Sequence, residues 1–370
     1  MSYQIRAATR RDIPALKAFF LEAYGGSTIF QDEKFLLWYF GRESHRDEAL
    51  SCAVAYAEGG AIAAHYGYLP QQLLLTDGSV LTLAWGVSAY TLPQHRGKGL
   101  GEKLLKHVLP GTDVFGVIGF TPETASFYEA MGFELFNKKR FKRFVFSLSK
   151  DILEITDRIA IAREKIAPLL ANGLQRKASI ETKTESVRYF DRSDFMKFAL
   201  PAAGRIARIG RDRQYLQWRF FENPFLNYEM LGVIEDQRIK AYIVQRREQL
   251  RPTPYFATRV VDVNGDVEAL KPAVAYSLRQ SMNRNDAFLE FGAFGNAYDL
   301  LFEGLGFDLL QEDDAEILPQ VSDPIEARPN HEYLGLFSAT RKDVILSLSK
   351  DSVLFTRADS DRDRAARVPA

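Results

Sequence analysis

The chain has 370 residues with 48 basic and 48 acidic side chains, so its composition indicates no general attraction to nucleic acid or to an anionic membrane surface. Cys52 is the single cysteine, which excludes an internal disulfide and a cysteine-cluster metal site and fits a reducing cytoplasm. The 5 histidines lack metal-ligand spacing, the first residues are too polar for a signal peptide, and no apolar run is long enough to span a bilayer. We therefore expect a cytoplasmic protein that has no metal and binds neither nucleic acid nor membranes.

The first elements read as a mixed α/β fold. Apolar residues recur at helical spacing from Arg11 to Tyr24, and the glycine pair that follows ends this helix. Around it, apolar and β-branched patterns predict further elements. These are a strand at Tyr3 to Ala8, a helix at Asp32 to Phe40, and strands at Ser51 to Ala57 and Ala61 to Leu75.

A glycine-rich turn then joins a strand to a helix. Val80 to Tyr90 reads as a largely buried strand, and apolar residues from Leu100 to Val108 recur at helical spacing. The turn between them holds glycines that let an anion approach the unpaired N–H groups of the helix N-terminus without meeting a Cβ. Two cationic side chains stand beside these glycines. The predicted anion cradle comprises Arg96, Gly97, Lys98, Gly99, Leu100 and Gly101.

A second strand and helix follow the cradle. Asp113 to Phe120 reads as another buried strand, and Pro122 to Met131 reads as a short helix that carries Tyr128. A further strand, Arg140 to Leu148, is predicted to close the sheet of the first half.

These motifs resemble the GNAT superfamily of N-acetyltransferases. The alternating glycines fit neither the dinucleotide fingerprint nor the P-loop, whereas Arg96-x-x-Gly99-x-Gly101 is similar to the acyl-CoA pyrophosphate loop of this family. The segment around Tyr128 is similar to the helix whose tyrosine faces the CoA sulfur, although Thr121 stands where the family often has asparagine. The resemblance implies acetyl-CoA as the donor, Tyr128 as a general acid, and a pantetheine arm that pairs with the backbone of Ala89, Tyr90 and Thr91.

The general base is open at this point. Many relatives supply a glutamate from the fourth strand, and Val80 to Tyr90 contains none. His65 is the nearest ionisable candidate because histidine accepts a proton near neutral pH, but most such histidines are structural. A water chain or the substrate itself is the alternative.

The second half repeats the first. Asp32 to Phe40 returns as Asp212 to Phe220, and the segment from Tyr128 returns from Phe302. The second copy has Asn264-Gly265-Asp266 in place of the cradle and a phenylalanine in place of the tyrosine, so we expect it to have lost CoA binding.

The predicted architecture is two GNAT-like α/β (α+β) domains in tandem, each a mixed, mostly antiparallel twisted sheet flanked by helices. The boundaries are 1–150 for the catalytic domain, 151–187 for a helix and polar linker, 188–345 for the degenerate domain and 346–370 for a final strand and charged tail.

The linker helix is expected from Asp151 to Leu170, with Asn172-Gly173 as its end. The tail from Arg357 alternates arginine and aspartate, which predicts either disorder or docking as a charged strap.

The resemblance extends over nearly the whole chain by the order of elements, but only over the first half by specific motif. It implies an enzyme that moves an acetyl group from acetyl-CoA to the amine of a small molecule, with an amino sugar as the first guess. The alternatives are an aminoacyl transferase of cell-wall precursors and a non-catalytic acyl-CoA sensor. We expect a monomer or a homodimer.

The repeated helix also offers candidate acceptor contacts, although aromatic residues in this position more often lock a helix onto a sheet. The candidates are Trp38, Trp218, Arg219 and Glu222.

Overall fold

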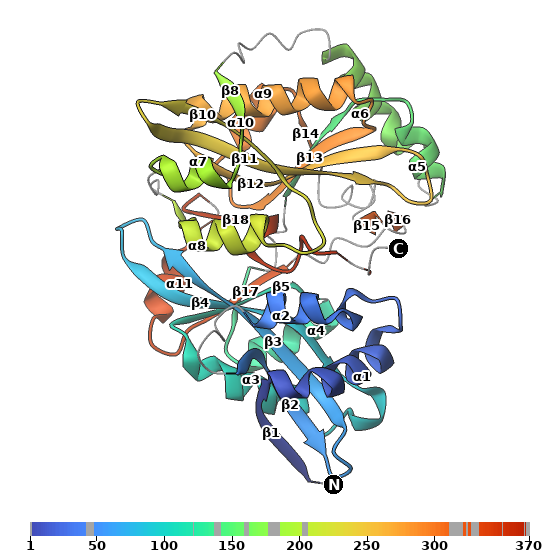
Figure 1. The fold of residues 1–370 in the computed structure, drawn as a ribbon, viewed down its shortest axis with the longest axis vertical. Helices are drawn as coiled ribbons and strands as arrows, with labels where there is room; N and C mark the ends of the chain where they lie inside the picture. Colours follow the sequence, from blue (N-terminus) through green and yellow to red (C-terminus); the bar gives the residue numbers. More distant parts are fainter. Residues whose placement is uncertain are drawn as a thin grey trace.

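The computed structural model describes residues 2–41, 48–120, 122–136, 142–158, 163–176, 186–201, 206–310, 321–322, 325–326, 333–349, 351–365 and 367. Figure 1 shows two layered α/β halves, one above the other, with the N-terminus at the far end of the first half and the C-terminus beside the junction. Sixteen of the described strands, from both halves, belong to one continuous sheet, joined where β9 (Ala207–Ile209) pairs with both β3 (Ile62–Leu74) and β18 (Val353–Thr356).

The first half confirms the elements predicted from its apolar patterns. Helix α1 buries one face against the sheet, as its helical spacing predicted, through Ile13, Leu16, Phe19 and Phe20. Helix α3 begins at the predicted residue. The helices are α1 (Ile13–Tyr24), α2 (Glu33–Phe40), α3 (Leu100–Val108) and α4 (Pro122–Ala130), and the remaining strands are β1 (Tyr3–Thr9), β2 (Ala49–Ala57), β4 (Val80–Thr91), β5 (Val114–Phe120) and β6 (Glu134–Leu135).

The two halves exchange one strand each. The prediction that Arg140 to Leu148 closes the first sheet is wrong, because β7 (Lys142–Ser147) pairs with β13 (Phe288–Phe294) and β14 (Asp308–Leu310) of the second half. The place in the first sheet is taken by β17 (Tyr333–Phe337), which lies between β5 and β6. The phenylalanines of β7 are buried in the core of the second half. Their apolar character predicted a buried strand but did not specify which sheet would bury it.

With this exchange, both halves show the same order of strand pairing. The first half runs β6–β17–β5–β4–β3–β2–β1, and the second runs β14–β7–β13–β12–β11–β10–β8. In each half one central pair is parallel, β4 with β5 and β12 with β13. The further elements of the second half are β8 (Val187–Phe190), β10 (Glu229–Glu235), β11 (Arg238–Gln249), β12 (Phe256–Gly265), α7 (Arg192–Lys197), α8 (Arg213–Leu216), α9 (Val267–Asn283) and α10 (Asp299–Gly304). Helix α11 (Lys342–Ser347) follows β17 and lies beside the first half, and β15 (Val321–Ser322) and β16 (Ile325–Glu326) form a separate short hairpin.

Two helices, α5 (Ile152–Arg158) and α6 (Arg163–Arg176), follow β7. The predicted helix end at Asn172-Gly173 is wrong, because α6 continues through both residues. A Cβ at Gly173 would collide with the carbonyl oxygen of Ser147, so this glycine allows close packing of α6 on β7. The Asn172-Gly173 pair looked like a helix C-cap in the sequence, but the glycine is required by the close packing of α6 on β7.

The repeated tryptophans lock the halves together. Trp38 and Trp218 stack with ring centroids 5.5 Å apart, and each indole N–H donates to the other residue's carbonyl oxygen at 2.9 Å. This reciprocal arrangement joins α2 to the π-helical turn Gln217–Phe221 that follows α8, so the two repeated segments contact each other at the junction of the halves.

Candidate active site

The first half contains a cavity of about 840 Å³ where two parallel strands separate. Strands β4 and β5 pair from Leu83 and Val114 as far as Gly86 and Val117, and the described ladder stops there. Beyond this point Val87 to Thr91 and Ile118 to Phe120 line opposite walls of the cavity. The edge of β4 that faces β5 thus offers backbone hydrogen-bonding groups to an extended ligand.

A bulge shapes β4 at this opening. The pairing of β3 with β4 slips between His65, which opposes Tyr90, and Gly67, which opposes Val87. Ser88 lies in the bulge with a φ of 52°, an uncommon value for a residue other than glycine. The predicted pantetheine residues Ala89, Tyr90 and Thr91 all line the cavity directly after the bulge.

The predicted anion cradle is exposed at one end of β4. Gly97 and Gly99 have φ values of 72° and 67°, and a Cβ at either would meet nothing within 4 Å. Gly99 is the N-cap of α3 and supplies no side chain to the first N–H groups of this helix. Arg96 folds back so that its Nε donates to the Thr91 carbonyl at 3.2 Å. The loop therefore presents open backbone donors and a tethered cation next to the predicted pantetheine strand.

Two buried tyrosines meet on one side of the cavity. The hydroxyl of Tyr128, on α4, lies 3.3 Å from the hydroxyl of Tyr66 on β3. Burial raises the pKa of both phenols, so both are protonated at neutral pH. Sequence reasoning singled out Tyr128 and missed Tyr66, whose period-two place in β3 gave no sign that it would face α4.

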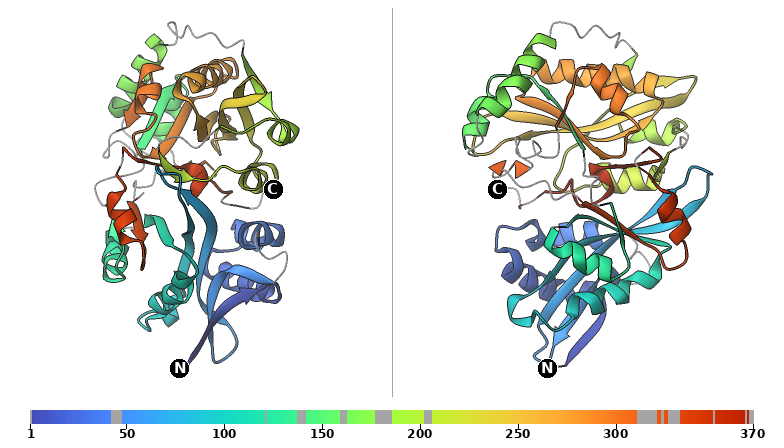
Figure 2. Two further views of the ribbon diagram at one scale, coloured as in Figure 1. Left: turned by 90° about the vertical axis from the view of Figure 1, so that its left-hand side faces the viewer. Right: turned by 180° about the vertical axis from the view of Figure 1, so that it is seen from behind.

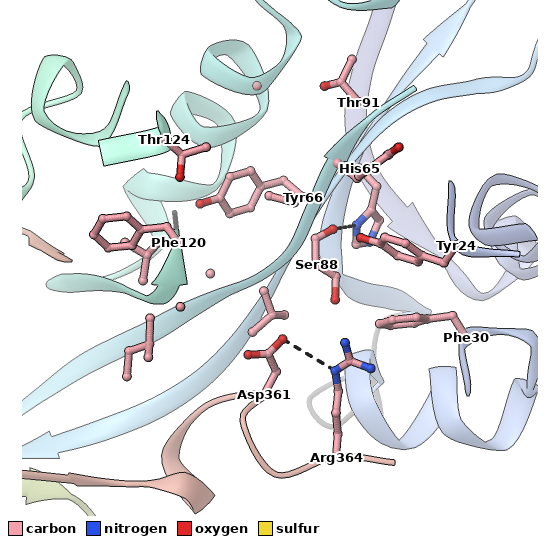
Figure 3. A pocket seen from close by; sticks show the side chains of 18 of the residues that line it. Tyr24, Phe30, His65, Tyr66, Ser88, Thr91, Phe120, Thr124, Asp361 and Arg364 are labelled. Carbon is pink, nitrogen blue, oxygen red and sulfur yellow. Dashed lines mark hydrogen bonds and ion pairs between the residues drawn. The ribbon is translucent and has the colours of Figure 1, made fainter. Parts of the chain in front are cut away.

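His65 supports the bulge. Its Nδ1 lies 2.9 Å from the carbonyl oxygen of Ser88, which makes Nδ1 the protonated nitrogen and the donor (Figure 3). Burial lowers the pKa of His65 to about 4, because the ring packs among Phe19, Phe20 and Phe40. A neutral imidazole with such a pKa is a poor base, so the arrangement favours positioning of Ser88 over the base role that the sequence suggested.

The other side of the cavity brings together residues far apart in the chain. Tyr24 and Phe30 come from the first helical region, while Asp361 and Arg364 come from the C-terminus (Figure 3). Burial raises the pKa of Tyr24 to about 12, so this hydroxyl is neutral. Sequence reasoning predicted none of these four as site residues, and the sole signal was the charged pattern of the tail.

The tail docks as a strap, one of the two predicted outcomes. We call residues 357–365 and 367 the C-terminal strap; Figure 2 shows the chain here crossing between the halves. Asp359 pairs with Arg211 of the second half at 2.6 Å. Asp363 pairs with Arg246 at 2.6 Å and accepts a hydrogen bond from the Tyr228 hydroxyl at 2.7 Å. Both carboxylates are at most 1% exposed, so the second half fixes this strap through buried charge pairs.

The second half lacks an equivalent cradle in the described residues. Asp266 accepts a hydrogen bond from the N–H of Glu268, so its carboxylate occupies the N-terminus of α9. Phe302, which replaces the tyrosine, is fully buried and stacks on Phe291 at 4.3 Å.

The remaining predicted contacts lie elsewhere. The described residues that line the cavity do not include the four predicted acceptor contacts, Trp38, Trp218, Arg219 and Glu222. Arg219 instead donates to the carbonyl oxygens of Ala358 and Asp363 at 2.8 and 2.7 Å, which holds the strap. Within the described part of the chain, no group of three or more metal-ligating side chains is found, and no helix is long and apolar enough to cross a membrane.

Comparison with known proteins locates a family domain in this half. Residues 48–135 match the family model of the acetyltransferase (GNAT) domain. No curated protein matches the chain.

Several solved structures share the fold across both halves. A GCN5-related N-acetyltransferase from Kribbella flavida has a TM-score of 0.55 at 13% identity, over 90% of this chain and 70% of that one. A GCN5-related N-acetyltransferase from Anabaena variabilis has a TM-score of 0.54 at 13% identity, over 90% and 72%. An N-myristoyltransferase from Saccharomyces cerevisiae with bound myristoyl-CoA has a TM-score of 0.53 at 11% identity, over 91% and 79%. Each match spans both halves of this chain.

Proposed function

We propose that this chain, which carries a GNAT acetyltransferase domain, transfers an acyl group from acyl-CoA to an amine. The observation that carries the proposal is the separation of β4 from β5, with an open glycine cradle at one end and the Tyr128 hydroxyl beside the gap. Acetyl-CoA is the proposed donor, and a small molecule such as an amino sugar is the proposed acceptor. We also propose that the enzyme acts in the cytoplasm, where it binds a soluble acyl-CoA.

The donor takes the groove from the cradle to the tyrosines. Its pyrophosphate binds the N–H groups at the start of α3, with Arg96 and Lys98 as cationic neighbours. Its pantetheine arm pairs with the free edge of β4 at Ala89 to Thr91. The thioester then lies where β4 and β5 diverge, beside Tyr128.

The chemistry follows from the protonation states. The amine nitrogen attacks the thioester carbon, a C–N bond forms and the C–S bond breaks. Tyr128, whose raised pKa keeps it protonated, donates its proton to the departing sulfur, and Tyr66 stabilises the phenolate by a hydrogen bond. The proton lost by the attacking nitrogen restores the phenol, so the net products are an amide and free CoA.

Calorimetric titration of acetyl-CoA tests donor binding. We expect one site per chain, and we expect Gly99→Glu to abolish it by placing a carboxylate in the cradle. Gly78→Glu is the matched control, because Gly78 also has a positive φ, 85°, and open space around its Cβ position. Both variants place a side chain at a positive φ, and only one touches the proposed site. Absence of binding in the wild type would refute the proposal, and two sites would show that the second half also binds donor.

Thiol release in the presence of amines tests turnover. Binding without turnover, unaffected by Tyr128→Phe, would favour the acyl-CoA sensor. Dependence on aminoacyl-tRNA would favour the aminoacyl transferase. A parallel titration with myristoyl-CoA compares the two donors, since one structural neighbour contains that molecule. If myristoyl-CoA binds more tightly than acetyl-CoA, a long-chain acyl-CoA becomes the proposed donor.

A further inference from the structure

The charge at the acceptor end of the cavity comes from the C-terminal strap. Among the described residues that line the cavity, the side chains charged at neutral pH are Asp361, Arg362, Arg364 and Arg367. The strap thus contributes a net excess of positive charge in a partly enclosed space, where charges act strongly. His65, in the same lining, is neutral because burial lowers its pKa to about 4.

Asp361 and Arg364 form a pair that faces the cavity. The Asp361 carboxylate lies 3.7 Å from Nε of Arg364, beyond hydrogen-bond distance, and the guanidinium stacks over the Phe30 ring at 5.0 Å. The described residues provide no hydrogen bond to the terminal nitrogens of Arg364 in this arrangement. Figure 3 shows both side chains reaching into the cavity on the side of Ser88 and Phe30, away from Thr124 and Phe120.

The surrounding groups are neutral donors and acceptors. Tyr24 is a protonated phenol, and the Ser88 hydroxyl is buried and has no partner among the described residues. Figure 3 shows Ser88 between His65 and Arg364. A buried hydroxyl without a partner is costly, so a polar ligand group at this point would satisfy it. The recess therefore holds the Asp361 carboxylate, the guanidinium fork of Arg364 among three arginines, and the Ser88 hydroxyl without a partner among the described residues.

We propose that the acyl acceptor is an amine that also carries an oxyanion, either a carboxylate or a phosphate. This inference rests on the proposed acyl transfer. The guanidinium of Arg364 binds the oxyanion, because its fork of donors matches two oxygens of such a group. The carboxylate of Asp361 pairs with the ammonium group and passes one of its protons to solvent before attack, so that a neutral amine reaches the thioester. The second proton, lost after attack, restores the Tyr128 phenol. Arg367, exposed at the same end, adds attraction for the anion.

The role of the second half follows from this geometry. It fixes the strap through Asp359 and Asp363, and the strap carries the acceptor-binding side chains into the first half. The degenerate copy thus acts on the reaction through the strap.

Paired acceptors test the inference. We would measure thiol release from acetyl-CoA with glucosamine and glucosamine 6-phosphate, and with glycinamide and glycine, so that the two pairs distinguish phosphate from carboxylate. We expect at least a tenfold higher kcat/KM for the anion-bearing member of one pair. Arg364→Gln should reduce that preference to below threefold, while Arg158→Gln, which changes an arginine paired with Glu154 on α5, should leave it unchanged.

Thermal melting of the CoA complex provides a readout that needs no turnover. The anion-bearing probe should raise Tm more than its neutral partner, and Arg364→Gln should remove the difference. Equal effects of paired probes on both turnover and Tm, or a preference unaffected by Arg364→Gln, would overturn the inference. Failure of the wild type to bind acetyl-CoA would instead overturn the proposed function, so the two failures are distinct.

Discussion

Asp363→Asn should loosen the C-terminal strap and weaken acceptor binding while donor binding stays intact. Asp363 is 1% exposed, and its two carboxylate oxygens contact Arg246 at 2.6 Å and Tyr228 at 2.7 Å. Burial alone would raise the pKa of this carboxyl, but the charges of Arg246 and Arg219 outweigh burial and hold the pKa below its ordinary value. The group is therefore ionised in the folded protein, and the substitution removes a buried charge.

The size of the effect follows from that burial. Removing one partner of a buried ion pair costs about 3–5 kcal/mol, because the other charge stays buried without compensation. Arg246 retains Glu248 as a second partner, so we expect a value near the lower end, about 3 kcal/mol. That corresponds to roughly a 100-fold weaker docking of the strap.

Urea denaturation, calorimetry and acceptor kinetics together check this expectation. The free energy of unfolding should fall, KM for the acceptor should rise about tenfold or more, and Kd for acetyl-CoA should stay within about twofold. Asp343→Asn is the control, because Asp343 is exposed and lies 3.7 Å from its partner Arg341; its effect should be below about 0.5 kcal/mol. An unchanged denaturation midpoint, or an equal loss of donor and acceptor affinity, would refute the reasoning. Because the pKa of Asp363 is lowered, its stabilising contribution is complete above the ordinary carboxyl range and is lost as the pH falls below about 4.

Three further predictions concern the cavity and the packing around it. Tyr128→Phe should lower kcat about 100-fold with little change in Kd for acetyl-CoA, and Tyr66→Phe should have a smaller effect; equal kcat in wild type and Tyr128→Phe would contradict the acid role. The pKa of His65 is lowered to about 4 by burial, so the folded state disfavours its protonation and stability should fall as the pH drops from about 6.5 to about 4. His65→Gln should flatten this pH dependence of stability in denaturation curves. If NMR shows that the His65 ring titrates near the ordinary histidine pKa, burial of His65 is not the cause. Gly173→Ala should destabilise the fold by about 1–3 kcal/mol in urea denaturation because α6 must move away from the Ser147 carbonyl, and no change would show that this contact relaxes freely.

Local elements were predictable because periodicity and capping are local properties. The apolar spacing of α1 and α3 placed both helices, and the glycines before α3 placed the start of that helix. The turn before α3 was also readable from sequence, since Gly97 and Gly99 adopt the positive φ values that few other residues tolerate; anion binding at this turn stays a prediction. The repeated tryptophan motif predicted a repeated helix, and the structure adds that the two tryptophans contact each other.

The partner of a buried strand could not be read from its residues. The phenylalanines of β7 fit the interior of either half, and only the tertiary structure shows that this strand pairs with β13 while β17 pairs with β5. The side of the cavity lined by the C-terminal strap depends on the same long-range arrangement. Asp361 and Tyr24 are separated by most of the chain, and no periodicity relates them.

The sequence by itself determined most of the elements of the first half, the glycine turn before α3 and the place of Tyr128 on α4, because each depends on residues within a few positions of one another. Only the tertiary structure decided which half buries β7 and β17, which groups surround His65, and where the charged tail docks. The physical reason is that burial and buried charge pairing are properties of neighbours in space. Asp363 in an isolated tail is a solvated acid, but once Arg246 and Arg219 enclose it, it fixes a strap across the cavity.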